Sequence, residues 1–250
     1  MRVLILGGSN EATQLAARLA DDSAFQPVLS LAGRTRHPAP SPIPCRIGGF
    51  GGAIGLASYL RSQAIDVVID ATHPFAEQMS ANAISAAGET QTPLVVFSRP
   101  PWMPGPGDRW VEFVSAEAAA QAIGATGRRV FLTVGRLQLP AFETAPQHDY
   151  LIRTIDPPEP KPNLPRYRVL LARGPFTIED EVRLMRVEQT EVLVTKNSGG
   201  DSTRAKLDAA RSLGLEVIMV RRPPPPDAPT LHALETVMSF LRARLHSAAP

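Results

Sequence analysis

The sequence predicts an α/β protein of two Rossmann-like domains, each with a parallel sheet flanked by helices. Short apolar runs alternate with helical patterns along the chain, which is typical of a parallel sheet that helices cover on both faces. This alternation occurs twice, and residues 98–127 separate the two series with a proline-rich, extended beginning. We therefore expect a first domain over residues 1–105 and a second over residues 106–250.

The elements follow from the spacing of apolar residues. In the first series, apolar runs predict strands at residues 3–6, 28–31, 67–69 and 94–97, and helical spacing predicts helices near residues 10–20, 54–62 and 76–87. In the second series, we expect strands at residues 130–134, 150–154, 169–172, 192–194 and 217–220, with helices near residues 178–187, 203–213 and 231–245. Proline clusters at residues 38–44, 157–165 and 223–226 mark loops.

The composition is that of a soluble globular protein, with 250 residues, 44% hydrophobic, 20% charged and a net charge of +2. The basic residues form no aromatic-interleaved stripe, so no nucleic-acid partner is expected. The first apolar run lacks a basic leader, and no apolar stretch reaches about 18 residues, so we expect no signal peptide, no membrane partner and a cytoplasmic location. The single Cys45 excludes an internal disulfide and is expected to pack.

The most informative segment is the glycine turn that follows the first apolar run. It leads from a strand directly into a helix, which aims backbone N–H groups and the positive end of a helix dipole at one point. Against the dinucleotide fingerprint G-x-G-x-x-G/A, the three positions hold Gly7, Ser9 and Ala12, so the match is partial. The segment predicts a cofactor phosphate site, with a plain buried strand and tight turn as the alternative. The predicted contacts are Gly7, Gly8, Ser9, Asn10 and Glu11.

The end of the second strand predicts which nucleotide binds. NAD-specific folds carry an acidic residue there for the ribose hydroxyl, whereas this chain has Gly33, Arg34 and Arg36. A guanidinium pairs with a 2′-phosphate and a carboxylate repels it, so the sequence favours NADP over NAD. The alternative is that both arginines are ordinary solvated loop charges.

Ligands of open α/β sheets gather outside the carboxyl ends of the strands, so the residues after each apolar run are further candidates. Thr72 and His73 follow the strand at 67–69 and are expected to face a nicotinamide, although His73 could simply brace its turn. The loop at 195–200 is basic and ends in glycines, which suits an anion. Arginines at several strand ends favour a polyanionic ligand, with ordinary surface charges as the alternative. They are Arg99, Arg136 and Arg153.

Five blocks of the sequence carry a resemblance to a known family. They are residues 7–12 (Gly-Gly-Ser-Asn-Glu-Ala), 70–76 (Asp-Ala-Thr-His-Pro-Phe-Ala), 99–102 (Arg-Pro-Pro-Trp), 133–136 (Thr-Val-Gly-Arg) and 195–200 (Thr-Lys-Asn-Ser-Gly-Gly). In this order they resemble the precorrin-6A reductases of cobalamin biosynthesis. The resemblance implies an NADPH-dependent reduction of one double bond in the precorrin-6A macrocycle, giving precorrin-6B. It also implies a small-molecule tetrapyrrole ligand whose acetate and propionate side chains need cations.

With this resemblance, the second domain is expected to contact the substrate. The candidates for shaping the reaction are His73 and Lys196, and either could bind a carboxylate instead of moving a proton. The expected substrate contacts are Arg99, Gly135, Arg136, Arg153, Lys196, Asn197, Ser198, Gly199 and Gly200. No metal site is expected, because the five histidines and Cys45 lack metal-ligand spacing. A reductase of another anionic metabolite and a non-catalytic NADP-binding regulator remain alternatives, and the substrate could be metal-free or cobalt-bearing.

Overall fold

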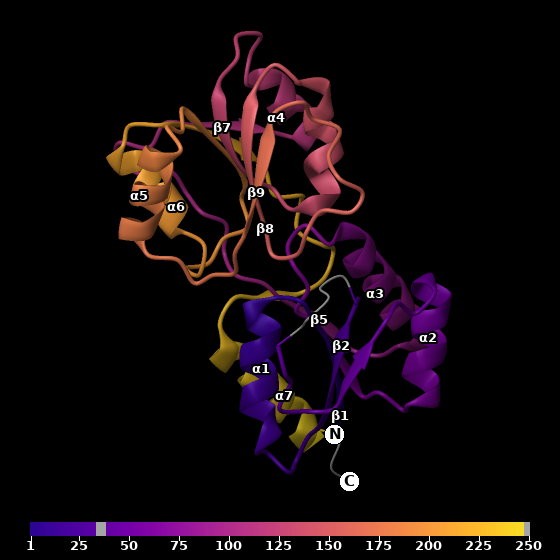
Figure 1. Cartoon of the computed structure of the whole chain (residues 1–250). Coiled ribbons are helices and arrows are strands. Elements are labelled where there is room, and N and C mark those ends of the chain that lie inside the picture. The colour runs from indigo at the N-terminus through magenta and orange to yellow at the C-terminus, as the bar shows by residue number, and fades with distance from the viewer. Residues whose placement is uncertain (34–38, 248–250) are drawn as a thin grey trace. The chain divides into compact units, whose positions relative to one another are not determined.

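The computed structural model describes residues 1–33 and 39–247, which divide into two compact units. The first unit comprises Met1–Pro100 together with Pro223–Pro250, and the second comprises Pro101–Arg222. The chain therefore leaves the first unit once and returns to it for the last segment. Figure 1 labels the elements of both units, and each unit is an α/β structure as predicted.

The described part of the first unit forms a six-stranded parallel sheet of order β12-β5-β4-β1-β2-β3. Its strands are β1 (Arg2–Leu6), β2 (Gln26–Leu31), β3 (Cys45–Ile47), β4 (Val67–Asp70), β5 (Leu94–Phe97) and β12 (Thr230–Leu231). Its helices are α1 (Asn10–Ala20), α2 (Gly52–Ser62), α3 (Glu77–Thr90) and α7 (Leu234–Ser247).

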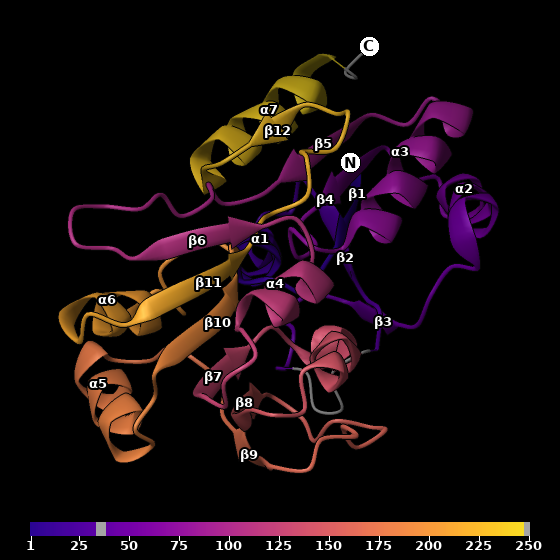
Figure 2. The same cartoon turned by 90° about the horizontal axis from the view of Figure 1, so that it is seen from above.

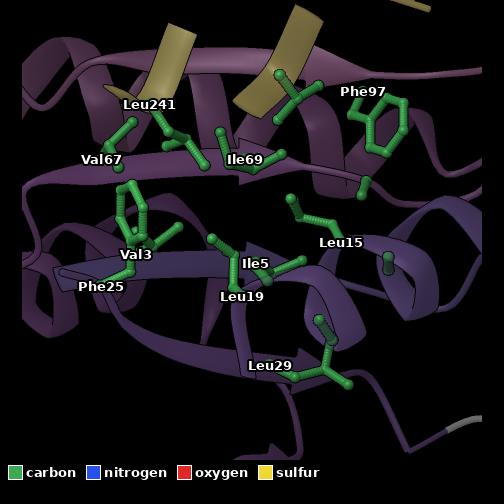
Figure 3. Packing of buried hydrophobic residues seen from close by; sticks show 14 of the residues in the cluster. Val3, Ile5, Leu15, Leu19, Phe25, Leu29, Val67, Ile69, Phe97 and Leu241 are labelled. Atoms are coloured by element: carbon green, nitrogen blue, oxygen red, sulfur yellow. The ribbon is translucent and has the colours of Figure 1, made fainter. Parts of the chain in front are cut away.

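Helices cover both faces of this first sheet because its central strands are apolar on both sides. On one face, Val3 and Ile5 of β1 pack with α1 and α7, and Figure 3 shows this cluster with Leu15, Leu19 and Leu241. On the opposite face, the alternate residues Leu4 and Leu6 pack with Leu56 and Leu60 of α2 and with α3. The side-chain period of two along a strand thus divides one continuous apolar run between two hydrophobic layers.

The second unit, all of whose residues are described, holds another six-stranded parallel sheet, of order β6-β11-β10-β7-β8-β9 (Figure 2). Its strands are β6 (Trp110–Phe113), β7 (Arg129–Thr133), β8 (Asp149–Thr154), β9 (Tyr167–Leu171), β10 (Val192–Lys196) and β11 (Glu216–Val220). Its helices are α4 (Ala116–Ala122), the 3₁₀ helix η1 (Arg136–Thr144), α5 (Ile178–Val187) and α6 (Ala205–Ser212).

The core of the second unit follows the same logic as that of the first. Phe131 of β7, Leu193 of β10 and Met219 of β11 pack against α5 and α6, which contribute Met185 and Leu207. All five side chains are buried. The strands of both sheets therefore end at carboxyl edges that stable, close-packed layers hold in place.

Each predicted strand and helix overlaps an observed one, and the predicted fold class is confirmed. Three strands were not predicted: β3, β6 and β12. The interpretation of residues 98–127 as a connection was wrong in part, because this segment contains β6 and α4. Cys45, expected to pack, is exposed.

The predicted division at residue 105 differs from the observed one in the C-terminal segment. Thr230 of β12 pairs with Val96 of β5, and Val237 and Leu241 of α7 lie in the first core. Residues 223–250, assigned to the second domain on sequence order, therefore complete the first unit. Within the described ranges, none of the helices has both the length and the apolar character that a membrane crossing requires.

Candidate functional site

The glycine turn lies at the carboxyl end of β1, between this strand and α1. A Cβ on Gly7 would meet Leu29 Cδ1 at 2.6 Å and Leu31 Cδ2 at 3.1 Å, so a side chain here would disturb the packing against β2. Gly8 has a φ of +120°, and a Cβ there would have nothing within 4 Å. Gly7 is thus required by close packing, whereas Gly8 leaves open space at the start of the helix.

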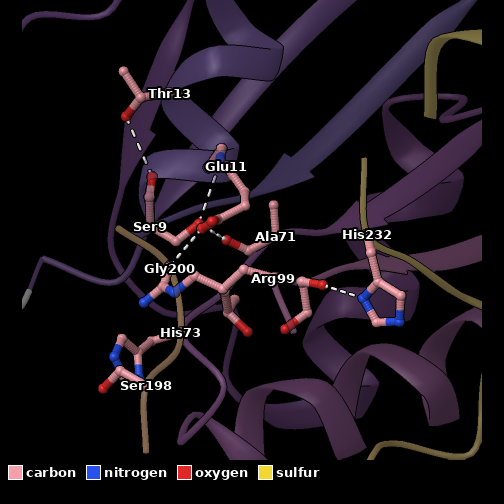
Figure 4. Close-up of polar contacts among 12 residues, drawn as sticks. Ser9, Glu11, Thr13, Ala71, His73, Arg99, Ser198, Gly200 and His232 are labelled. Atoms are coloured by element: carbon pink, nitrogen blue, oxygen red, sulfur yellow. Dashed lines mark hydrogen bonds and ion pairs between the residues drawn. The ribbon is translucent and has the colours of Figure 1, made fainter. Parts of the chain in front are cut away.

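Ser9 stands where the dinucleotide fingerprint has its second glycine, and it is the N-cap of α1. Its hydroxyl accepts a hydrogen bond from Ala12 N at 3.2 Å and donates one to Ala71 O at 2.7 Å (Figure 4). The side chain therefore links the ends of β1 and β4. The first N–H groups of a helix, here those of Asn10 and Glu11, have no acceptor within the helix and form the positive end of its dipole.

Glu11 and Arg99 were expected to contact different ligands, but the structure pairs them with each other. Arg99 Nη1 lies 2.5 Å from Glu11 Oε2, and their side chains are only 16% and 13% exposed (Figure 4). A carboxylate held at a helix N-terminus adds negative charge at the position where a phosphate would bind, and the guanidinium offsets it. Both residues belong to the first unit.

The block after β4 is organised by the buried carboxylate of Asp70. Its Oδ1 accepts hydrogen bonds from Thr72 N at 3.1 Å and Thr72 Oγ1 at 2.7 Å, and its Oδ2 accepts from Ser80 Oγ at 2.6 Å. The hydroxyl of Thr72, an expected cofactor contact, thus donates to a carboxylate within the turn. Asp70 directly follows an apolar run in the sequence, so the strand-end rule could have identified it.

His73 follows in the same turn, and its ring makes a local contact. Phe75 N donates to His73 Nδ1 at 3.2 Å, and the centroids of the two rings lie 5.8 Å apart. Because Nδ1 accepts, a neutral imidazole carries its proton on Nε2. The ring therefore braces its turn, but as an acceptor through Nδ1 and not through a ring N–H as the alternative expected, and the tautomer leaves Nε2 as the donating atom.

Of the three residues predicted to select the nucleotide, the structure describes only Gly33. Gly33 follows β2 with a φ of +74°, and a Cβ on it would lie 3.1 Å from Ile47 Cγ2 of β3. Arg34 and Arg36 lie outside the described residues.

In the second unit, the carboxyl ends of β7 and β10 bring Gly135 and Lys196 together. Lys196 Nζ lies 3.8 Å from the position that a Gly135 Cβ would take, so the ammonium group passes over a residue without a side chain. Burial lowers the pKa of Lys196 to about 8. Arg136 Nη2 is 3.8 Å from Asp156 Oδ2 at the end of β8. Two cations with different surroundings thus lie at neighbouring strand ends.

In the loop after β10, the side chain of Asn197 forms hydrogen bonds with the protein backbone. Asn197 was expected to contact substrate, but its side chain is buried and bonded to the backbone of Trp102 in both directions. Its Oδ1 accepts from Trp102 N at 2.8 Å, and its Nδ2 donates to Trp102 O at 3.0 Å. Gly199 and Gly200 have φ values of +70° and +75°, a conformation that glycine adopts without strain.

Arg153, expected to hold a substrate carboxylate, is instead buried and pairs with a carboxylate of the protein. It is buried, its Nη1 and Nη2 both donate to the carboxylate of Glu181, and its guanidinium carbon lies 3.9 Å from the ring centroid of Phe176. The sequence does not reveal this partner, because Glu181 is an acidic residue in the first turn of α5, where solvated carboxylates are common. We therefore remove Arg153 from the candidate substrate contacts.

The remaining candidates fall into two groups, one at the carboxyl edge of each sheet. The first unit holds Gly7–Glu11, Thr72, His73 and Arg99, and the second holds Gly135, Arg136 and residues 195–200. Three contributors were missed as site residues: Asp70, Asp156 and Arg222. Asp156 comes two residues after β8, and Arg222 donates hydrogen bonds to Asn197 O and Ser198 O. Among the residues that the structure describes, no three His, Cys, Asp or Glu side chains gather as a metal site.

Two parallel sheets flanked by helices, with a glycine turn leading into a capped helix at the end of β1, place the protein in the class of Rossmann-like α/β proteins. The family model described as "Precorrin-6x reductase CbiJ/CobK" matches residues 2–242. The chain belongs to this family of oxidoreductases, which act on a carbon–carbon double bond of the precorrin macrocycle in cobalamin biosynthesis.

Individual relatives agree with this assignment. A "Precorrin-6A reductase" of a Sinorhizobium species is 50% identical over 95% of this chain and 91% of its own length. Another, of Rhodobacter capsulatus, is 48% identical over 100% of this chain and 98% of its own. The solved structure titled "CobK precorrin-6A reductase" superimposes with a TM-score of 0.93 at 48% identity, covering 97% of this chain and 96% of that one.

Proposed function

We propose that this chain reduces precorrin-6A to precorrin-6B with NADPH as the reductant. In this proposal the first unit binds the nucleotide and the second unit holds carboxylates of the macrocycle. The observation that carries it is the pair of cations at the carboxyl edge of the second sheet, Lys196 over Gly135 and Arg136 beside Asp156. A ring bearing acetate and propionate groups is a ligand that such a set of cations suits.

The residues at the glycine turn fit a dinucleotide. The open space at Gly8 and the N–H groups at the start of α1 suit a pyrophosphate, and the Glu11 carboxylate nearby is neutralised by Arg99. When bound, a reduced nicotinamide supplies a hydride. The residues proposed to hold the cofactor are Gly7, Gly8, Gly33, Arg34, Arg36, Thr72 and His73, together with the backbone N–H groups of Asn10 and Glu11, with Ser9 shaping the turn.

Reduction of a double bond also requires a proton for the neighbouring carbon and an environment that accepts developing negative charge. Lys196 suits both needs, because a group with a pKa near 8 is mostly protonated at neutral pH yet releases its proton more readily than an exposed lysine. His73 is the second candidate, through its Nε2 proton. Arg136 serves as a carboxylate anchor, because a guanidinium can donate two parallel hydrogen bonds to a carboxylate.

The direct test supplies purified protein with NADPH and precorrin-6A and follows the pigment spectrum together with NADPH absorbance. We expect both to change with matched stoichiometry. NADPH oxidation with a different anionic metabolite alone would favour the alternative reductase, and NADPH binding without oxidation would favour a non-catalytic regulator.

The assignment of ligands to units is tested with Lys196→Ala, using Lys161→Ala as a control because Lys161 is exposed. We expect Lys196→Ala to raise the KM for precorrin-6A about tenfold, since a charge-assisted contact is lost, while the Kd for NADPH stays unchanged. The KM should also rise with ionic strength, and less steeply in Lys196→Ala. Loss of NADPH binding with an intact precorrin KM would reverse the two assignments.

The choice of NADPH over NADH is tested on Arg34 and Arg36. The double variant Arg34→Ala, Arg36→Ala should weaken NADPH binding about ten- to a hundredfold and leave NADH nearly unaffected, because only the former carries the 2′-phosphate. Equal losses for the two cofactors would remove this part of the proposal.

A further inference from the structure

The loop Asn197–Gly200, which directly follows Lys196 at the end of β10, is held by a tryptophan that lies far from it in sequence. Besides the two bonds between Asn197 and the Trp102 backbone, Trp102 Nε1 donates to Gly200 O at 2.8 Å. Trp102 and Asn197 are each only 4% exposed. Lys206 Nζ of α6 lies 5.1 Å from the indole centroid, which favours this orientation of the ring.

A second residue, Arg222, holds the same loop through two carbonyl groups. Its Nε donates to Asn197 O at 3.2 Å, and its Nη2 donates to Ser198 O at 2.8 Å. In a trans peptide the N–H of the next residue points opposite to the carbonyl, so these bonds and that to Gly200 O orient three peptide groups. Hydrogen bonds to the carbonyl groups of Asn197, Ser198 and Gly200 therefore hold the backbone that follows Lys196.

These two anchors have a shared position in the chain. Trp102 is the second residue of the unit Pro101–Arg222, and Arg222 is its last. The segments by which the chain enters and leaves the second unit thus both donate hydrogen bonds to the loop Asn197–Gly200. A loop with two positive-φ glycines has many conformations available, and ordering it before the ligand arrives reduces the entropy lost on binding.

We infer that Trp102 and Arg222 are positioning residues, which order the loop Asn197–Gly200 directly after Lys196, so that Lys196 and this loop meet a precorrin carboxylate in one orientation. The inference rests on the proposed function, in which this loop contacts the macrocycle. The positioning role requires neither residue to touch substrate. They act through Asn197, Ser198 and Gly200, by hydrogen bonds to the backbone and to the Asn197 amide.

The test compares the two tryptophans of the chain. Trp102→Phe removes the bond to Gly200 O and keeps an aromatic ring, whereas in Trp110→Phe no bond is lost, because the indole N–H of Trp110 has no hydrogen-bond partner among the described residues. We expect Trp102→Phe to raise the KM for precorrin-6A about three- to tenfold with an unchanged Kd for NADPH, and Trp110→Phe to leave both near wild type. Arg222→Lys should act in the same direction as Trp102→Phe.

A purely structural role predicts a different pattern, because loss of folded protein lowers the apparent kcat and leaves KM unchanged. Unchanged KM values in both Trp102→Phe and Arg222→Lys, or an equal rise in Trp110→Phe, would overturn the inference. If Lys196→Ala raises the KM and these variants do not, only the positioning role fails. If Lys196→Ala also leaves the KM unchanged, the proposed function of the loop fails with it.

A spectroscopic measurement covers the case in which activity is lost altogether. In the Trp110→Phe protein, Trp102 is the only tryptophan, so its fluorescence reports on the loop directly. Iodide should quench it weakly, and adding Arg222→Ala should raise the quenching constant because the loop opens to solvent. A quenching constant that does not change would show that Arg222 does not order this loop.

Discussion

Arg99 Nη1 donates to Glu11 Oε2 across 2.5 Å, and this ion pair joins the segment after β5 to the first turn of α1. The sequence assigned the two residues to different ligands, one to substrate and one to cofactor. In the structure the guanidinium neutralises a carboxylate at the end of the helix where a nucleotide phosphate is proposed to bind. We therefore expect Arg99 to influence the proposed cofactor site through its partner Glu11.

A double-mutant cycle tests this pairing. Arg99→Gln leaves the Glu11 carboxylate uncompensated and should weaken NADPH binding about tenfold, whereas adding Glu11→Gln should recover most of the loss. Titration of each variant with NADPH measures the effect, and Glu11→Gln alone is the control. Equal losses in the single and double variants would mean that Arg99 contacts the cofactor in its own right.

Two helical glycines of the first unit should respond oppositely to alanine. A Cβ on Gly55 of α2 would lie 1.7 Å from the carbonyl oxygen of Phe50, whereas one on Gly88 of α3 would have nothing within 4 Å. Gly55→Ala should lower the free energy of unfolding by about 3 kcal/mol, and Gly88→Ala should raise it by about 0.5–1 kcal/mol. Urea denaturation checks both, and similar values for the two variants would contradict the close approach at Gly55.

The buried pair Arg153–Glu181 should matter more for stability than an exposed pair in the same unit. Arg153→Met leaves the Glu181 carboxylate buried without its cation and should cost about 3–5 kcal/mol. Arg168, which pairs with Glu188, is 62% exposed, and Arg168→Met should cost at most about 1 kcal/mol. Denaturant unfolding of the two variants measures the difference, and a loss under 1 kcal/mol in Arg153→Met would argue against a buried ion pair.

Lys196 should make stability rise with pH in the alkaline range. Its pKa is about 8 in the folded chain and near 10.5 when unfolded, so between these values the unfolded state binds more protons. The free energy of unfolding contributed by this group therefore increases from about pH 8 to about pH 10.5. Lys196→Met should remove this rise and Lys161→Met should keep it, as measured by urea unfolding across that range. An identical pH dependence in Lys196→Met and wild type would exclude burial of the ammonium.

His148 should act in the same direction at acid pH. Burial lowers the pKa of its imidazole, whose Nδ1 accepts a hydrogen bond from Arg128 N at 3.2 Å. Below about pH 6.5 the unfolded state binds the extra proton, so stability falls as the pH decreases. His148→Asn should flatten the dependence between about pH 7 and 5, whereas the exposed His246→Asn should not. Unfolding curves at several pH values measure this dependence. If the free energy of unfolding of His148→Asn falls with pH as steeply as that of the wild type, His148 is not its source.

The strands that the sequence patterns missed all lie at sheet edges, although the patterns did predict one edge strand, β9. Central strands such as β4 and β10 are buried on both faces and appear as continuous apolar runs. The missed strands β3, β6 and β12 are all edge strands, and Cys45 and Val111 on two of them are exposed. An edge strand needs little apolar character, so its sequence resembles that of a loop.

For the candidate site, the sequence predicted the positions of several residues but not the partners of their side chains. The strand-end rule located the glycine turn, His73 and Lys196, because parallel strands all end at one edge. It did not reveal the partners of polar side chains, since Glu181 for Arg153 and Trp102 for Asn197 come from elsewhere in the chain. Hydrogen bonds between distant segments depend on the packed structure and leave no local pattern.

The return of the chain to its first unit also sets an order of events during synthesis. Residues 101–222 leave the ribosome before α7 exists, although Val237, Met238 and Leu241 of that helix belong to the core built on β1 and β4. The second unit can thus fold while its N-terminal neighbour still exposes the apolar face that α7 will cover. The first unit is thus the first to be synthesised and the last to complete its fold. Its strands need protection from aggregation until translation of α7 ends.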